Sequence, residues 1–123
     1  MSRKRILIVD DSPTSILWQR LILTELQYDV LTANDGQAGV DAAVAHHPDL
    51  ILMDVVMPRM GGFEAVRAIR MNDATARVPV IMVTTKSGSK NVEEGYQSGC
   101  NDYITKPIDK LELLTKVKSL LGE

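Results

Sequence analysis

The chain has 123 residues, of which 45% are hydrophobic, and a formal net charge of −2. This length and apolar content predict a single domain, residues 1–123, with a buried core. The charge argues against direct nucleic-acid binding, which needs a basic face. No apolar run approaches the roughly 18 residues of a membrane span, and the N-terminus lacks the pattern of a secretory signal. We therefore expect a cytoplasmic protein without membrane insertion.

Five short apolar runs alternate with longer segments of helical spacing. The runs are ILIV from Ile6, YDVLTA from Tyr28, LILM from Leu50, VIMV from Val80 and YI from Tyr103. The first, third and fourth runs are continuous rather than alternating, which is typical of strands that helices cover on both faces. The pattern predicts an α/β fold, in which five helices flank a doubly wound, five-stranded parallel sheet.

Capping residues indicate where the helices begin and end. Ser12 and Pro13 are typical of an N-cap and a first helical residue. The second helix is expected after Asp35 and Gly36, and the third where the segment GGF begins. The fourth is expected over about Ser89–Ser98 with Gly99 as its C-cap, and the fifth over about Asp109–Leu121. Helical spacing predicts two core-facing stripes: Trp18, Ile22, Leu23 and Leu26 in the first helix, and Leu114, Val117 and Leu121 in the fifth.

Polar residues follow four of the five runs. They are Asp10 and Asp11 after the first, Asp54 after the third, Thr84 and Thr85 after the fourth, and Lys106 and Pro107 after the fifth. Taken singly, each is an ordinary cap, turn residue or solvated charge. In a parallel sheet, however, they would share one edge, where ligands bind. Neighbouring carboxylates raise one another's pKa unless a cation intervenes, and Mg2+ suits such a site better than Ca2+.

These motifs resemble the receiver domain of bacterial two-component response regulators, and the resemblance covers essentially the whole chain. The matching segments are the acidic pair in ILIVDDSP, Asp54 in LILMDVVMPRMGG, Thr84 in VIMVTT, and Lys106 with Pro107 in DYITKP. The resemblance implies a flavodoxin-like sheet of order 2-1-3-4-5. It also implies that Asp54 is the phosphoacceptor, with a histidine kinase or a histidine phosphotransfer protein as donor.

The resemblance further implies roles for the residues around Asp54. Asp11, Asp54 and the backbone carbonyl of Val56 would bind Mg2+ directly, and Asp10 would act mainly through water. Lys106 would neutralise the phosphoryl oxygens in an in-line transfer to the carboxylate nucleophile, a reaction that depends on positioning and electrostatics.

A switch is implied at Thr84 and Tyr103. The Thr84 hydroxyl would donate to a phosphoryl oxygen, and the Tyr103 ring would turn inward in response. The alternative for Tyr103 is an ordinary half-buried strand aromatic. The bond between Lys106 and Pro107 is a candidate cis peptide.

Two positions beside the expected site should tune the lifetime of a phosphoryl group. Val56 lies two residues after Asp54, and Lys86 lies two residues after Thr84. An apolar Val56 cannot orient an attacking water molecule, so we expect slow to moderate self-dephosphorylation.

Two surfaces are candidates for partner binding. The first helix carries more apolar residues than one buried face needs: Ile16, Leu17 and Leu21 are the surplus, and Leu17 and Leu21 are the candidate contacts. The second surface joins Val92, Tyr96 and Tyr103. The alternative is that these are scattered, partly covered side chains.

We therefore expect a stand-alone phosphorylation switch, not a turnover enzyme, in chemotaxis or pilus-driven motility, as a monomer or a weak phosphorylation-dependent dimer. The sequence names neither the kinase nor the output partner. One alternative is a receiver fragment of a larger regulator. Another is a phosphatase of the haloacid dehalogenase type, whose nucleophile lies instead on the first strand in an Asp-x-Asp pattern.

Overall fold

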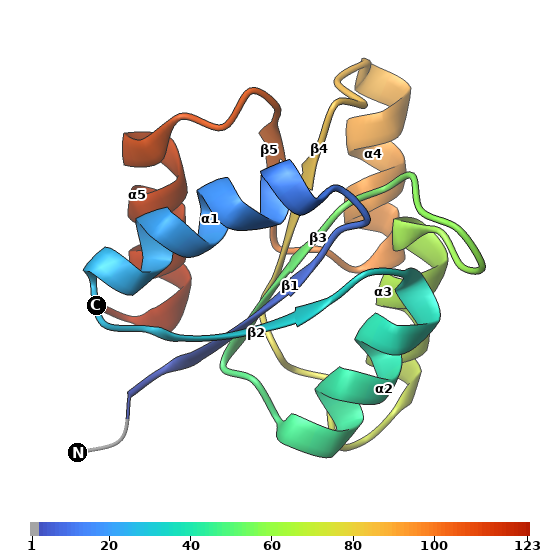
Figure 1. The fold of residues 1–123 in the computed structure, drawn as a ribbon. Helices are drawn as coiled ribbons and strands as arrows, with labels where there is room; N and C mark the ends of the chain where they lie inside the picture. Colours follow the sequence, from blue (N-terminus) through green and yellow to red (C-terminus); the bar gives the residue numbers. More distant parts are fainter. Residues whose placement is uncertain (1–2) are drawn as a thin grey trace.

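The computed structural model describes residues 3–123 and contains one parallel sheet (Figure 1). Its strands are β1 (Arg5–Val9), β2 (Asp29–Ala33), β3 (Leu50–Met53), β4 (Val80–Thr84) and β5 (Asp102–Thr105). Their order across the sheet is β2-β1-β3-β4-β5, and each neighbouring pair is parallel. The expected fold class and strand order are confirmed.

Four helices connect successive strands, namely α1 (Pro13–Glu25), α2 (Gly36–His46), α3 (Gly62–Met71) and α4 (Ser89–Ser98), and α5 (Lys110–Leu121) follows β5. The predicted N-cap Ser12 is present, and its side chain accepts a hydrogen bond from a backbone N–H of the first turn. The side chains of Asp35 and Asp109 cap α2 and α5 in the same way. Gly99 ends α4 with a φ of 115°. Between residues 3 and 123, no helix combines the length and apolar character needed to cross a membrane.

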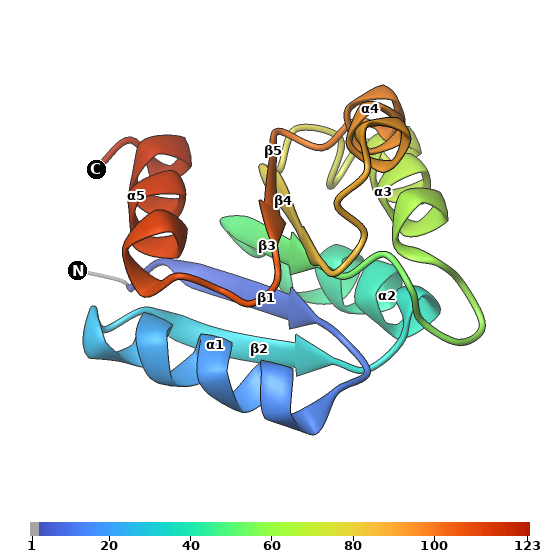
Figure 2. The same ribbon diagram turned by 90° about the horizontal axis from the view of Figure 1, so that it is seen from above.

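The helices form two layers, one on each face of the sheet. Seen from above, α1 and α5 cover one face, and α2, α3 and α4 cover the other (Figure 2). Alternate residues of β1 supply the two cores: Ile6 and Ile8 pack with α1 and α5, whereas Leu7 and Val9 pack with α2 and α3. Because both faces are covered, all four side chains are buried, as the continuous apolar run predicts.

The predicted core stripe of α1 is partly wrong. Trp18 and Leu26 are 44% and 37% exposed, whereas Gln19 is buried beside Ile22 and Leu23. Two features explain the difference. The Trp18 indole N–H donates to the carbonyl of Ile108 at 3.2 Å, which holds the ring against the loop between β5 and α5, and Leu26 lies beyond the last helical turn as the C-cap.

The predicted stripe of α5 is also partly wrong: Val117 is buried as predicted, but Leu113 takes the place expected for Leu114. Leu113 and Val117 are buried, while Leu114 and Leu121 are only partly covered. The buried pair is four residues apart, which places both side chains on the same side of the helix. Apolar residues at 113 and 114 both suit a helix face, so spacing alone did not decide which of them points inward.

Gly62 lets α3 begin directly against the backbone of Asp54. A Cβ atom at residue 62 would lie 1.9 Å from the Asp54 carbonyl oxygen, so any side chain there would displace the main chain. Nearby, the Gly62 N–H donates to the carbonyl of Val55 at 2.8 Å. The loop after Asp54 is therefore packed tightly against the start of α3.

We expect Gly62→Ala to lower the free energy of unfolding by about 2 kcal/mol, because overpacking against main chain cannot be relieved by a rotamer change. Urea denaturation followed by circular dichroism measures the change. Gly88→Ala is the control, because its Cβ would be 3.6 Å from its nearest contact, the Asn91 amide nitrogen. Equal stability of the two variants would show that the close approach at Gly62 carries no cost.

Candidate functional site

Three carboxylates gather at the carboxyl ends of β1 and β3. Asp10, Asp11 and Asp54 each offer an oxygen atom, and these atoms lie within 4.8 Å of one another. Parallel pairing of Val9 with Met53 brings the following residues together, and the Asp54 N–H donates to the Val9 carbonyl at 2.9 Å. Asp10 and Asp54 are buried and Asp11 is exposed. The predicted grouping is confirmed, and its oxygen donors fit a hard divalent cation.

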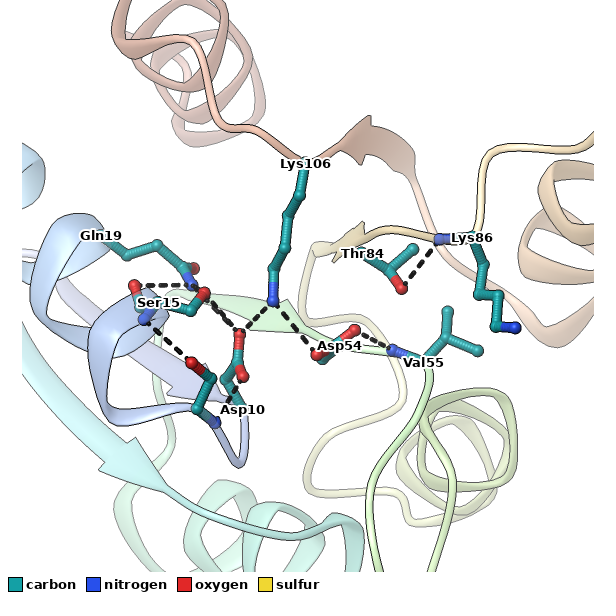
Figure 3. Close-up of polar contacts among 9 residues, drawn as sticks. Asp10, Ser15, Gln19, Asp54, Val55, Thr84, Lys86 and Lys106 are labelled. Carbon is teal, nitrogen blue, oxygen red and sulfur yellow. Dashed lines mark hydrogen bonds and ion pairs between the residues drawn. The ribbon is translucent and has the colours of Figure 1, made fainter.

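Lys106 bridges the two buried carboxylates. Figure 3 shows its side chain reaching from the end of β5 between Asp10 and Asp54, with Nζ at 2.8 Å from Asp10 Oδ2 and 3.2 Å from Asp54 Oδ2. Burial alone would lower the pKa of Lys106, but the hydrogen bond to Asp10 and the charge of Asp54 raise the pKa overall. The ammonium is therefore charged at neutral pH and offsets part of the repulsion.

Asp54 and Asp10 are held to different degrees. Asp54 Oδ1 accepts the Val55 N–H at 2.7 Å, and Asp54 Oδ2 accepts only Lys106 within residues 3–123. Asp10 Oδ2 accepts both Lys106 and the Ser15 hydroxyl, the latter at 2.7 Å. The Asp54 side chain is 11% exposed and that of Asp10 only 1%. Of the buried pair, Asp54 is thus the freer and more accessible.

Thr84 and Tyr103 are joined through the backbone of Lys86. The Lys86 N–H donates to Thr84 Oγ1 at 3.3 Å, and the Tyr103 hydroxyl donates to the Lys86 carbonyl. Burial raises the pKa of Tyr103, which keeps this phenol protonated as a donor. Among the described residues, the Lys86 ammonium itself makes no hydrogen bond or ion pair. The peptide of Lys86, not its side chain, makes the contacts.

The expected surface residues differ in how much surface they contribute. Leu17 and Leu21 are more than half exposed, Tyr96 is 47% exposed, and Val92 packs partly against the core. Tyr103 is only 7% exposed, so in this conformation it offers little surface to a partner.

The remaining predicted site features lie near Asp54 and Lys106. Val56 is exposed in the loop after Asp54, and the peptide between Lys106 and Pro107 is cis, as expected.

Sequence reasoning missed two groups of residues. Ser15 and Gln19 bind one another beside Asp10. A polar residue at 19, on the same helical face as Ile22 and Leu23, was the available signal. Gly95 of α4 is the other: its missing side chain makes room for the Tyr103 ring, since a Cβ at 95 would lie 3.0 Å from Tyr103 Cε2.

The model of the response regulator receiver domain matches residues 6–118. The chain belongs to this family. It is 42% identical to Protein PilH of Pseudomonas aeruginosa, over 96% of this chain and 98% of that protein. Several other curated relatives are longer, and the chain spans 26% to 52% of them. Receiver domains are phosphorylation-dependent signalling switches, and nothing in the comparisons supports the haloacid dehalogenase alternative.

Solved receiver structures superpose closely on this one. The chemotaxis protein CheY4 of Vibrio cholerae has a TM-score of 0.90 at 32% identity, covering 97% of this chain and 99% of that one. The receiver domain of the histidine kinase PA1611 from Pseudomonas aeruginosa has a TM-score of 0.92 at 33% identity, covering 99% and 100%. That receiver holds a magnesium ion in its active-site cleft.

We expect Gly95→Ala to displace the Tyr103 ring, because the added methyl carbon would lie 3.0 Å from Cε2 and 3.1 Å from Cδ2, closer than van der Waals contact. Nitration of Tyr103, mapped by peptide mass, should increase. In a Tyr103→Ala background the same change should raise the free energy of unfolding by about 1 kcal/mol, from helix propensity alone. Unchanged nitration in the single variant would contradict the close contact.

Proposed function

We propose that residues 1–123 form one receiver domain that accepts a phosphoryl group on Asp54 from a histidine kinase or a histidine phosphotransfer protein. The observation that carries the proposal is the unequal engagement of the buried carboxylates. Among residues 3–123, Asp54 Oδ2 has one donor, Lys106, at 3.2 Å, whereas Asp10 Oδ2 has the shorter bonds to Lys106 and Ser15. A lightly engaged, more exposed oxygen is the better nucleophile.

The acidic group suits Mg2+, which when bound would offset carboxylate charge and polarise phosphoryl oxygens. Asp11 and Asp54 would be direct ligands, together with the backbone carbonyl of Val56. Asp10 would act through water, because its two oxygens accept three close hydrogen bonds, from Ser12, Ser15 and Lys106, whereas those of Asp54 accept two, from Val55 and Lys106. The magnesium ion in the similar PA1611 receiver supports this assignment.

The chain's own groups would carry out the transfer by positioning and charge. The Val55 N–H orients the Asp54 carboxylate, whose Oδ2 would attack phosphorus in line. The bond from phosphorus to the donor histidine nitrogen breaks, and the imidazole leaves as the oxygen–phosphorus bond forms. Lys106 already lies within reach of Asp54 and would bind a phosphoryl oxygen. Asp54 would thus end as an acyl phosphate.

The switch would run through the Lys86 peptide. Thr84 is fully buried, and its Oγ1 accepts the Lys86 N–H. Donation of its hydroxyl to a phosphoryl oxygen would move this contact and, through the Lys86 carbonyl, the hydrogen bond to Tyr103. A phosphoryl group shifts the balance between two conformations only if it binds one of them more tightly. The hydrogen bond from Thr84 would supply this difference in binding.

The output would be binding of another protein, in chemotaxis or motility signalling in the cytoplasm. Support for the pathway is the likeness to the chemotaxis protein CheY4. Leu17 and Leu21 form one candidate surface, and Val92 and Tyr96 the other. The protein would be a monomer or a weak phosphorylation-dependent dimer. It would assist its own phosphorylation and dephosphorylation without turning over an external substrate.

Incubation with acetyl phosphate and Mg2+ tests the proposal. The wild-type protein should gain the mass of one phosphoryl group, and Asp54→Asn should gain none, because the nucleophilic oxygen is lost. Asp41→Asn, which changes an exposed carboxylate on α2, should label like the wild type. Chelation of Mg2+ should abolish labelling. Full labelling of Asp54→Asn would refute the assignment, and sustained release of many equivalents of phosphate would indicate a phosphatase.

Val56 and Lys86 are proposed to set the lifetime of the acyl phosphate. Val56→Asn would offer an amide that can orient water, so it should shorten the lifetime several-fold. Lys86→Ala, at the other flanking position, is the comparison. Decay of the phosphorylated mass after donor removal measures both. A wild-type lifetime of only seconds would contradict the expected slow to moderate dephosphorylation.

A further inference from the structure

A small polar network connects α1 to Asp10. The Ser15 hydroxyl donates to Asp10 Oδ2 at 2.7 Å, and it accepts the Gln19 amide Nε2 at 3.0 Å (Figure 3). The Ser12 N–H donates to the other Asp10 oxygen at 2.9 Å. The network therefore fixes both oxygens of a carboxylate that lies between α1 and Lys106.

Packing does not account for Gln19. Its side chain is 1% exposed and lies on the same helical face as Ile22 and Leu23. Its Oε1 is buried and has no hydrogen-bond partner within the part of the chain that the structure describes. The Gln19 Nε2 also donates to the Ser15 carbonyl at 3.3 Å and to Asp10 Oδ2 at 3.5 Å, so the amide is directed at the Asp10 network. A leucine of similar volume would lose these hydrogen bonds but would also remove the buried, unpaired carbonyl, and the two effects on stability offset one another.

We infer that Ser15 and Gln19 are positioning residues for the divalent cation site. Gln19 orients the Ser15 hydroxyl, and Ser15 holds the Asp10 carboxylate beside Asp11 and Asp54. This inference rests on the proposed binding of Mg2+ at that site, and it adds two residues on α1 to the groups that determine the affinity.

The direction of the effect follows from repulsion. The oxygens of Asp10, Asp11 and Asp54 lie within 4.8 Å of one another, so repulsion favours a rotation of the Asp10 carboxylate away from its neighbours. When Ser15 is replaced, the Ser12 N–H still holds Oδ1, but Oδ2 keeps Lys106 as its one close donor among residues 3–123. Asp10 is then held less firmly beside the cation site, and ordering it again opposes cation binding. Loss of groups that orient metal-site carboxylates typically weakens binding about 10-fold to 100-fold.

Calorimetric titration with Mg2+ alone, in the absence of a phosphodonor, tests this role. Ser15→Ala removes the hydroxyl, Ser15→Thr keeps it, and Gln19→Leu replaces the amide with an apolar group of similar size. Ser15→Ala and Gln19→Leu should each weaken Mg2+ binding about 10-fold. This is the low end of the range above, because Asp10 would contact the cation through water. Ser15→Thr should bind like the wild type.

Urea unfolding without Mg2+ separates positioning from a merely structural role. Gln19→Leu should unfold at the same urea concentration as the wild type, or a higher one, while its Mg2+ affinity falls. Three results would each overturn the inference. Gln19→Leu could bind Mg2+ as tightly as the wild type, or it could lose both Mg2+ affinity and stability. Ser15→Thr could lose as much Mg2+ affinity as Ser15→Ala. A wild-type protein that binds no Mg2+ would overturn the proposed function and this inference with it.

Discussion

Repulsion among Asp10, Asp11 and Asp54 is the constraint on which the rest of the site depends. Strands β1 and β3 are neighbours in parallel register, so the residues that follow them must meet. Two of the three carboxylates are buried, where charges interact more strongly than in water. The positive charge of Lys106 offsets part of this repulsion. Lys106 follows β5, which lies two strands from β3 with β4 between them. The fold thus brings the repelling charges and their compensation to one edge.

The same residue type takes three roles because its surroundings differ. Asp10 is fixed by donors from α1 and by Lys106, so it serves as a charge held in place. Asp54 has a single N–H on one oxygen and a longer contact to Lys106 on the other, which leaves it open to an incoming group. Asp11 is exposed and can exchange water for a cation. Environment, not residue type, distinguishes the proposed nucleophile from its neighbours.

The parts of this arrangement that could be predicted from the sequence are those set locally. Strands followed from continuous apolar runs and helix starts from caps such as Ser12, and the strand ends then placed Asp54 and Lys106 together. The rotation of α1 could not be predicted in this way, because Trp18 and Gln19 are adjacent and either suits the periodic pattern. A hydrogen bond from Trp18 to a loop 90 residues later decided it, and that contact exists only in the folded chain.

Gly95 illustrates a second kind of information that spacing does not carry. A glycine inside a helix lowers the stability of that helix. At position 95, however, the missing Cβ also leaves the space in which the buried Tyr103 ring packs against α4. The position of that ring therefore has two determinants. One is fixed by the glycine at 95. The other is the hydrogen bond from the Tyr103 hydroxyl to the Lys86 carbonyl, whose peptide N–H donates to Thr84. In the proposed switch, phosphorylation would act only on the second, so the first would set the balance that a phosphoryl group has to shift.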